Sequence, residues 1–151
     1  TEPARLIIEE QRSINGIGVY EKNPELFLQL MLSRFIYNFR TISKSDNIVL
    51  FDRGIPDMIA YAELFSINKD VYINASKVYN YNKNVFIFKG WESIYTNDKE
   101  RKMDFESAEK FGIKVSEIYE SLGYNIIDVP FESIENRAEF ILRKIQEYTL
   151  K

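Results

Sequence analysis

Short apolar runs alternate with helical stretches along this chain, and that order constrains the fold more than any other feature. The runs at 48–52, 85–88 and 124–129 favour β-strands, and apolar residues at helical spacing follow them at about 56–67, 104–122 and 133–149. Alternating strands and helices are typical of a parallel sheet with helical crossovers. We therefore predict an α/β fold.

Further helices are expected at 2–12, from Pro24 to about Ser43, and at 73–82, with a loop over 13–23. Pro3 and Pro24 stand where a first helical turn tolerates proline, and Gly123 stands where a helix C-cap belongs. The second helix has a wide apolar face, which indicates burial on most sides.

Composition excludes several classes of site. The 151 residues are 45% hydrophobic and 28% charged, with a net charge of −3, and they contain no cysteine and no histidine. One domain, a cytoplasmic location and no nucleic-acid or membrane partner are expected. Without imidazole or thiolate, any chemistry depends on carboxylates, Lys, Arg and hydroxyls.

The run at 48–51 ends in Asp52-Arg53-Gly54, so a buried parallel strand would deliver an acid and a base to its carboxyl end. Asp52 would hold Mg²⁺, and Arg53 would clamp phosphoryl or substrate oxygens. The structural alternatives are that Asp52 caps the next helix and that Arg53 forms an ion pair with Asp57 or Glu2. No G-x-x-x-x-G-K-[ST] phosphate loop occurs in the chain.

Three motifs carry a resemblance to a known family. Thr1-Glu2-Pro3-Ala4-Arg5 is similar to an acidic turn after a second strand, and residues 51–57 with Ala60-Tyr61 are similar to a Walker B strand and its helix. Tyr95-x-x-Asp98-x-x-Arg101-Lys102 resembles a lid, and the pattern from Leu122 to Arg137 resembles a C-terminal strand and helix. Together they resemble P-loop kinases and ATPases, in particular AAA-type ATPases akin to the nicotinamide riboside kinase domain.

The resemblance implies a three-layer parallel sheet with helices on both faces, in a single domain over 1–151 with a lid at about 91–103. It also implies that a first strand, phosphate loop and second strand, roughly 30 residues, precede Thr1 or come from another segment. Residues 1–151 would then form the C-terminal four-fifths of the domain, and alone they should bind ATP weakly or not at all and be inactive. The alternative is a genuine short form whose sheet closes differently.

The same resemblance assigns roles to further residues. Glu2 would be the general base, as in the equivalent turn of deoxynucleoside kinases, and Arg5 and Asp57 would contact substrate, unless Arg5 is a surface partner of Glu2 or Asp57 only orients Arg53. Arg101 and Lys102 would close over the transferred phosphoryl group and the nucleotide, unless they belong to a solvated charged run.

The expected function is ATP- and Mg²⁺-dependent phosphoryl transfer to a small hydroxyl-bearing, nucleoside-type substrate, or ATP hydrolysis. Asp52, Arg53, Arg101 and Glu2 form its catalytic set, and Asp52 is on the metal side. The first alternative is an inactive nucleotide-fold module used for protein interaction. The second is a sensor of phosphate or lipid headgroups, which would need a basic patch.

Overall fold

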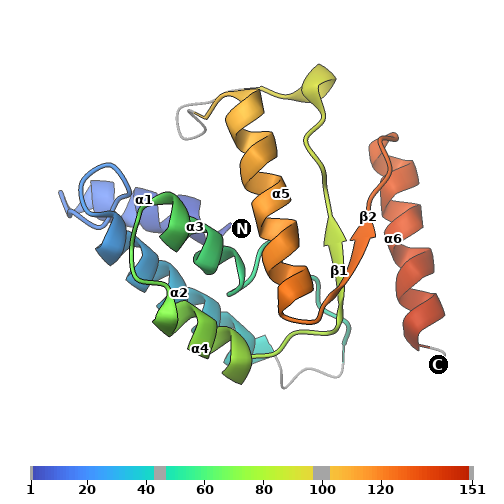
Figure 1. The fold of residues 1–151 in the computed structure, drawn as a ribbon, viewed down its shortest axis with the longest axis horizontal. Coiled ribbons are helices and arrows are strands. Elements are labelled where there is room, and N and C mark those ends of the chain that lie inside the picture. The colour runs from blue at the N-terminus through green and yellow to red at the C-terminus, as the bar shows by residue number, and fades with distance from the viewer. Residues whose placement is uncertain (1, 43–46, 97–102, 150–151) are drawn as a thin grey trace. The chain divides into compact units, whose positions relative to one another are not determined.

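The computed structural model describes residues 2–42, 47–96 and 103–149. The chain divides into two compact units, residues 1–81 and residues 82–151 (Figure 1). The first unit contains helices α1 (Pro3–Ser13), α2 (Pro24–Ile42), α3 (Asp57–Leu64) and α4 (Asp70–Val78). The second contains β1 (Asn84–Ile87), the 3₁₀ turn η1 (Glu92–Ile94), α5 (Phe105–Ser121), β2 (Asn125–Asp128) and α6 (Ile134–Thr149).

The predicted starts of α1 and α2 are confirmed. Pro3 occupies the first turn of α1, and the side chain of Asn23 accepts a hydrogen bond from the Leu26 N–H at 3.0 Å, which caps α2. Helix α2 buries one stripe rather than most of its surface: Phe27, Leu28, Met31, Leu32 and Phe35. This stripe packs with residues of α1 and α3 that are also buried, including Ile7 and Met58.

Three predicted boundaries are wrong: the end of α3 and both ends of α4, which ends at Val78 rather than at 82. At the first two of them, short polar turns override the apolar pattern. Helix α3 ends at Leu64, since Ser66 adopts a left-handed φ of 56° and the Ile67 N–H turns back to the Ala62 carbonyl at 2.8 Å. Helix α4 begins at Asp70 rather than at 73, since the Asn68 side chain accepts from the Asp70 N–H at 2.8 Å.

The prediction of a strand at 48–52 is also wrong. Residues 48–51 have no regular secondary structure, and Ile48, Val49 and Leu50 are 63%, 38% and 62% exposed. A strand forms only when a neighbouring strand satisfies its backbone groups. Among the described residues the only sheet pairs β1 with β2, so this β-favouring run has no ladder to join.

Aromatic side chains fix the end of this irregular segment. Phe51 lies 5.2 Å from Tyr81 and 6.5 Å from Phe39, measured between ring centroids, and Phe39 lies 5.2 Å from Tyr81. The Tyr81 hydroxyl also accepts a hydrogen bond from the Ile55 N–H at 3.3 Å. The backbone is therefore anchored on both sides of Asp52 and Arg53.

The loop between α1 and α2 is held closed by Gln11. Its side-chain oxygen accepts from the Gly18 N–H at 2.9 Å, and its carbonyl accepts from the Gly16 N–H at 2.7 Å. A Cβ on Gly18 would lie 2.6 Å from Leu30 Cδ1 and 2.8 Å from Gln11 Oε1. A methyl group here would therefore displace the ends of both side chains, and with Gln11 the hydrogen bond from the Gly18 N–H.

We expect Gly18→Ala to lower the free energy of unfolding by ~1–3 kcal/mol, because the added methyl overpacks this loop. Gly112→Ala is the matched control, since a Cβ there meets nothing within 4 Å, and helix α5 should gain ~0.5–1 kcal/mol. Chemical denaturation of the two variants measures both effects. Equal stabilities would contradict the packing seen around Gly18.

The second unit contains a parallel strand pair, as the alternating pattern predicts. Asn84 lies opposite Asn125 and Ile87 opposite Asp128, and in the view of Figure 1 the strands lie between α5 and α6. The buried residues of this unit come mainly from α5 and the segment after it: Val115, Ile118, Tyr119, Tyr124 and Val129. A parallel pair connected by a helix is an α/β arrangement.

The ends of α5 match the expected signals. Asp104 accepts a hydrogen bond from the Ser107 N–H at 2.8 Å, and this backbone bond lowers the pKa of Asp104. Gly123 has a φ of +82° and donates to the Glu120 carbonyl at 2.9 Å, which confirms the predicted C-cap.

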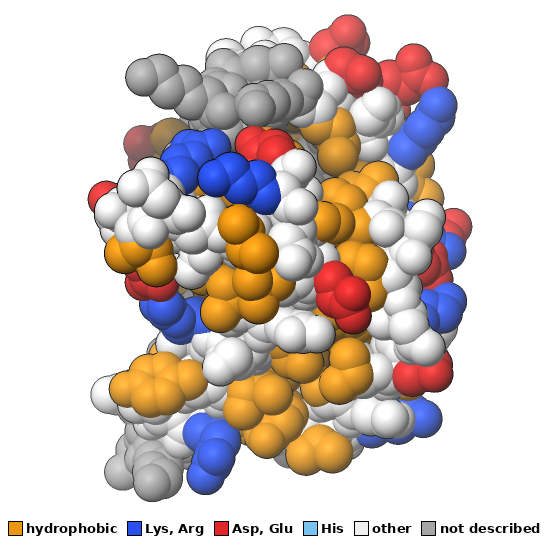
Figure 2. All heavy atoms as spheres, turned by 90° about the vertical axis from the view of Figure 1, so that its left-hand side faces the viewer, with side chains coloured by type: hydrophobic (Ala, Val, Ile, Leu, Met, Phe, Trp, Pro, Cys, Tyr) orange, Lys and Arg blue, Asp and Glu red, His pale blue; other side chains and the backbone are white. Residues whose placement is uncertain are grey.

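Figure 2 shows one face of the molecule, on which acidic, basic and hydrophobic side chains are interspersed. No broad region of a single charge is visible on that face, in keeping with the net charge of −3. In the described parts of the chain, no helix is both long and apolar enough to cross a membrane.

Candidate functional site

Arg53 is the centre of a charged cluster in the first unit. Its Nε lies 2.8 Å from Glu2 Oε1, and its Nη1 lies 3.8 Å from Asp57 Oδ1. Its backbone has a left-handed φ of 66°, which costs a side-chain-bearing residue about 1–2 kcal/mol. A strained residue of this kind persists only when its surroundings fix it, and such residues cluster at functional sites.

Glu2 is the residue immediately before α1. It contacts Arg53 although the two residues are 51 positions apart in the sequence. It makes no side-chain cap to that helix, so both carboxylate oxygens serve cations. Oε1 bonds Arg53, and Oε2 lies 3.6 Å from Arg5 Nε, one turn along α1. Glu2 therefore joins two guanidinium groups.

Asp57 supports Arg53 from the first turn of α3. Its side chain is only 7% exposed, and Oδ2 accepts a hydrogen bond from the Gly54 N–H at 2.9 Å. One carboxylate thus closes the turn after Arg53 and faces the guanidinium. This geometry explains how a left-handed residue is held between an irregular segment and a helix.

The cluster is partly open to solvent. The side chains of Glu2 and Arg53 are 21% and 32% exposed. Burial alone would lower the pKa of Arg53, but Tyr61, Asp57 and Glu2 raise it above its ordinary value. The guanidinium stays charged, and it is partly exposed, so its planar set of donors suits an oxyanion such as phosphate or carboxylate.

Asp52 lies next to this cluster in sequence but is exposed. It does not cap α3, whose N-cap is Pro56 without a side-chain cap. No group of three or more acidic side chains gathers as a metal site within the described residues. A single exposed carboxylate still fits Mg²⁺, which keeps several waters and takes its other ligands from phosphates.

Four of the predicted site residues, Glu2, Arg5, Arg53 and Asp57, therefore lie together. The predicted Arg101 and Lys102 lie outside the described residues. Two described residues of the predicted lid, both in the second unit, are hydrogen-bonded to each other: the Tyr95 hydroxyl donates to the Met103 carbonyl at 2.7 Å. The Tyr95 ring lies 5.4 Å from the ring of Phe105, measured between centroids.

Two tyrosines support the cluster in ways that sequence reasoning did not predict. Tyr81 anchors Ile55, two residues after Arg53, and Tyr61 interacts electrostatically with Arg53 itself. Tyr61 belongs to the motif that resembles a Walker B strand and its helix, but that motif did not indicate its interaction with Arg53. Nothing in the sequence indicates that Tyr81 folds back onto the segment at 51–55.

Comparison with known families gives one match. A family model described as AAA domain matches residues 1–137. Searches of curated proteins and of solved structures returned no match.

Proposed function

Because this chain belongs to the AAA-domain family, we propose that its nucleotide-dependent activity is ATP- and Mg²⁺-dependent phosphoryl transfer to a small hydroxyl-bearing substrate. The family indicates a P-loop NTPase-type domain with an α/β fold and nucleotide binding in general. A three-layer sheet, ATP and Mg²⁺ as cofactors, and a kinase-like reaction with a nucleoside-type acceptor are parts of the proposal.

The cluster of Glu2, Arg53 and Asp57 is the observation that supports it. Phosphoryl transfer requires positioned charges more than covalent chemistry. A guanidinium held between two carboxylates, with its backbone fixed at an unusual φ, is a preoriented positive charge. When bound, Mg·ATP would supply the phosphoryl group and the metal charge that offsets its oxygens.

The side chains of the cluster have distinct proposed roles. Arg53 binds oxygens of the phosphoryl group or substrate, and Asp57 orients it or contacts the substrate. Glu2 accepts the proton of the substrate hydroxyl, and Arg5 contacts the substrate. Glu2 is free to accept this proton once Arg53 has shifted its hydrogen bond from Glu2 Oε1 toward the ligand. Arg101 and Lys102 are proposed to act over the nucleotide.

The proposed role of Asp52 at the metal can be tested by mutation. In the full-length protein, we expect Asp52→Asn to raise the Mg²⁺ concentration for half-maximal activity by about tenfold. Stability should change by less than ~0.5 kcal/mol, because Asp52 is exposed. The measurement is transfer of labelled γ-phosphate from ATP to a panel of hydroxyl compounds and to water.

Asp70→Asn is the control, since Asp70 is an exposed acid in the first turn of α4. A Mg²⁺ dependence that is the same for both variants would contradict the role of Asp52. The pairing of Arg53 inside the chain also favours a second candidate, an inactive module in which the cluster only stabilises the fold. Absence of any γ-phosphate transfer or hydrolysis by the intact wild-type protein would favour that module.

A further inference from the structure

Tyr81 contacts the segment that carries Arg53 on both sides of that residue. Its ring lies 5.2 Å from the Phe51 ring, measured between centroids, and its hydroxyl accepts a hydrogen bond from the Ile55 N–H at 3.3 Å. All of these residues belong to the first unit, of which Tyr81 is the last residue. A single side chain therefore holds the chain both before and after Arg53.

The hydrogen bond from Ile55 is one that the fold needs. Ile55 is completely buried, at 0% exposure, and a buried N–H group that lacks an acceptor costs free energy. The Tyr81 hydroxyl supplies the acceptor. Loss of this hydroxyl would favour any rearrangement of the turn that gives the Ile55 N–H another acceptor or exposes it to water.

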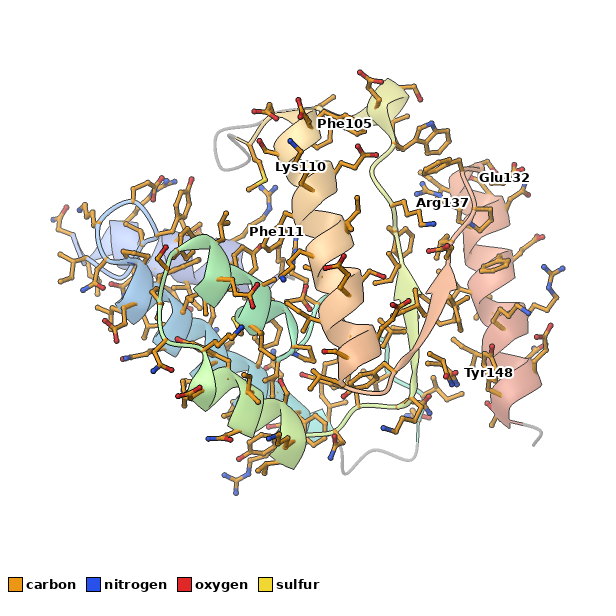
Figure 3. All side chains as sticks on the ribbon, in the orientation of Figure 1. Phe105, Lys110, Phe111, Glu132, Arg137 and Tyr148 are labelled. Carbon is orange, nitrogen blue, oxygen red and sulfur yellow. The ribbon has the colours of Figure 1, made fainter. Side chains whose placement is uncertain are left out.

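The ring of Tyr81 is itself held in place by α2. It meets the Phe39 ring edge-on, with centroids 5.2 Å apart and an angle of 85° between the ring planes. Such edge-to-face pairs have a preferred geometry, so they restrict the orientation of both rings. Figure 3 shows the side chains in the orientation of Figure 1; Phe39 belongs to α2, and Tyr81 lies three residues after the end of α4.

The backbone of Arg53 makes this support important. Its φ of 66° is left-handed, a conformation that a residue with a side chain leaves readily unless its neighbours fix it. The direction of the side chain depends on this backbone, because a return to an extended or right-handed φ would turn the Cα–Cβ bond away.

From these contacts we propose that Tyr81 is a positioning residue for Arg53. By holding the chain at Phe51 and at Ile55, it keeps the guanidinium directed at Glu2 in the free protein and at the oxyanion during the reaction. The second part of this inference rests on the proposed function, and the first part does not. Tyr81 itself contacts no reacting atom in this proposal.

The first measurement requires no activity. In the full-length protein, Tyr81→Phe keeps the ring but removes the acceptor of the Ile55 N–H. We expect solvent exchange of the Arg53 Nε–H, which donates to Glu2 at 2.8 Å, to become about tenfold faster, as measured by NMR. Equal exchange rates in wild type and Tyr81→Phe would overturn the proposal.

Tyr79→Phe is the matched control. Tyr79 is half-buried like Tyr81, and its ring also meets Phe39, with centroids 5.6 Å apart, but the Ile55 N–H donates to Tyr81. The exchange rate of the Arg53 Nε–H should be the same in Tyr79→Phe as in wild type. An equal acceleration in both variants would show a general loosening of the aromatic packing and would overturn the specific role of Tyr81.

The second measurement is the steady-state rate of γ-phosphate transfer. Tyr81→Phe should lower kcat by about tenfold with little change in KM, because a misdirected Arg53 stabilises less transition-state charge. In an Arg53→Ala background, Tyr81→Phe should have no further effect on kcat, since a positioning residue acts through the group that it positions.

A full additional loss of kcat in the double variant would contradict action through Arg53. A loss of stability in Tyr81→Phe with wild-type kcat and wild-type exchange would show that Tyr81 is only structural. A wild-type protein that transfers no γ-phosphate would contradict the proposed function, and the exchange rates would then decide by themselves whether Tyr81 positions Arg53.

Discussion

Arg53→Ala should lower kcat/KM for phosphoryl transfer by about 100-fold or more in the intact protein. Removing one preoriented group that stabilises transition-state charge typically has an effect of this size. The change also removes the guanidinium that the carboxylates of Glu2 and Asp57 both contact, and it leaves Glu2 with Arg5 alone. Since Arg53 is about one-third exposed, we expect destabilisation of ~2 kcal/mol, between the values for surface and buried pairs.

Two further variants separate the charge of Arg53 from its backbone. Arg53→Gly also removes the guanidinium but accepts the φ of 66°, so it should be more stable than Arg53→Ala by ~1 kcal/mol and equally inactive. Arg34→Ala is the control for loss of an ion pair, since Arg34 pairs with Glu10 at 2.9 Å and is 34% exposed. Steady-state kinetics measure the loss of activity, and chemical denaturation measures the loss of stability, in each variant. An Arg53→Ala enzyme that loses stability but keeps its kcat/KM would show that the cluster is structural.

Glu2→Gln should lower kcat by about 10²–10⁴-fold and leave KM nearly unchanged, if Glu2 is the general base. Glutamine keeps the size of the side chain and an oxygen that can accept the Arg53 hydrogen bond, but it cannot take up a proton at neutral pH. The stability loss should stay near ~1 kcal/mol, because the pair is partly solvated and Glu2 makes no helix cap.

Glu10→Gln supplies the comparison on the same helix. Glu10 holds Arg34 through both oxygens, at 3.1 and 2.9 Å, in an exposed pair. Its replacement should leave kcat unaffected. If the two glutamine variants reduce kcat to a similar small extent, Glu2 only positions Arg53, and the proton acceptor must be sought elsewhere.

Local signals in the sequence predict most of the helices and the strand pair β1 and β2. Asn23 and Pro24 at the start of α2, and Gly123 after α5, act through neighbouring backbone groups, so their effects are readable from short stretches. The prediction of a strand at 48–52 was wrong because a strand depends on residues that are distant in the sequence. The run has the apolar composition of a strand, but nothing within it shows whether a partner strand exists.

The sequence indicated which residues belong to the charged cluster, but not how they contact one another. Residue types and motifs pointed to Glu2, Arg53 and Asp57, yet they did not decide whether Arg53 is paired inside the chain or free for a ligand. The 2.8 Å contact joins residues 51 positions apart, and such contacts depend on how α1 packs in the folded unit.

The two oxygens of Asp57 connect a loop backbone to a guanidinium, and this has an evolutionary consequence. One oxygen accepts the Gly54 N–H and the other faces Arg53. The orientation of the Arg53 side chain and the start of α3 therefore both depend on Asp57. Neither can be altered alone without loosening the other. Related sequences should therefore exchange positions 53 and 57 as a pair, or retain both.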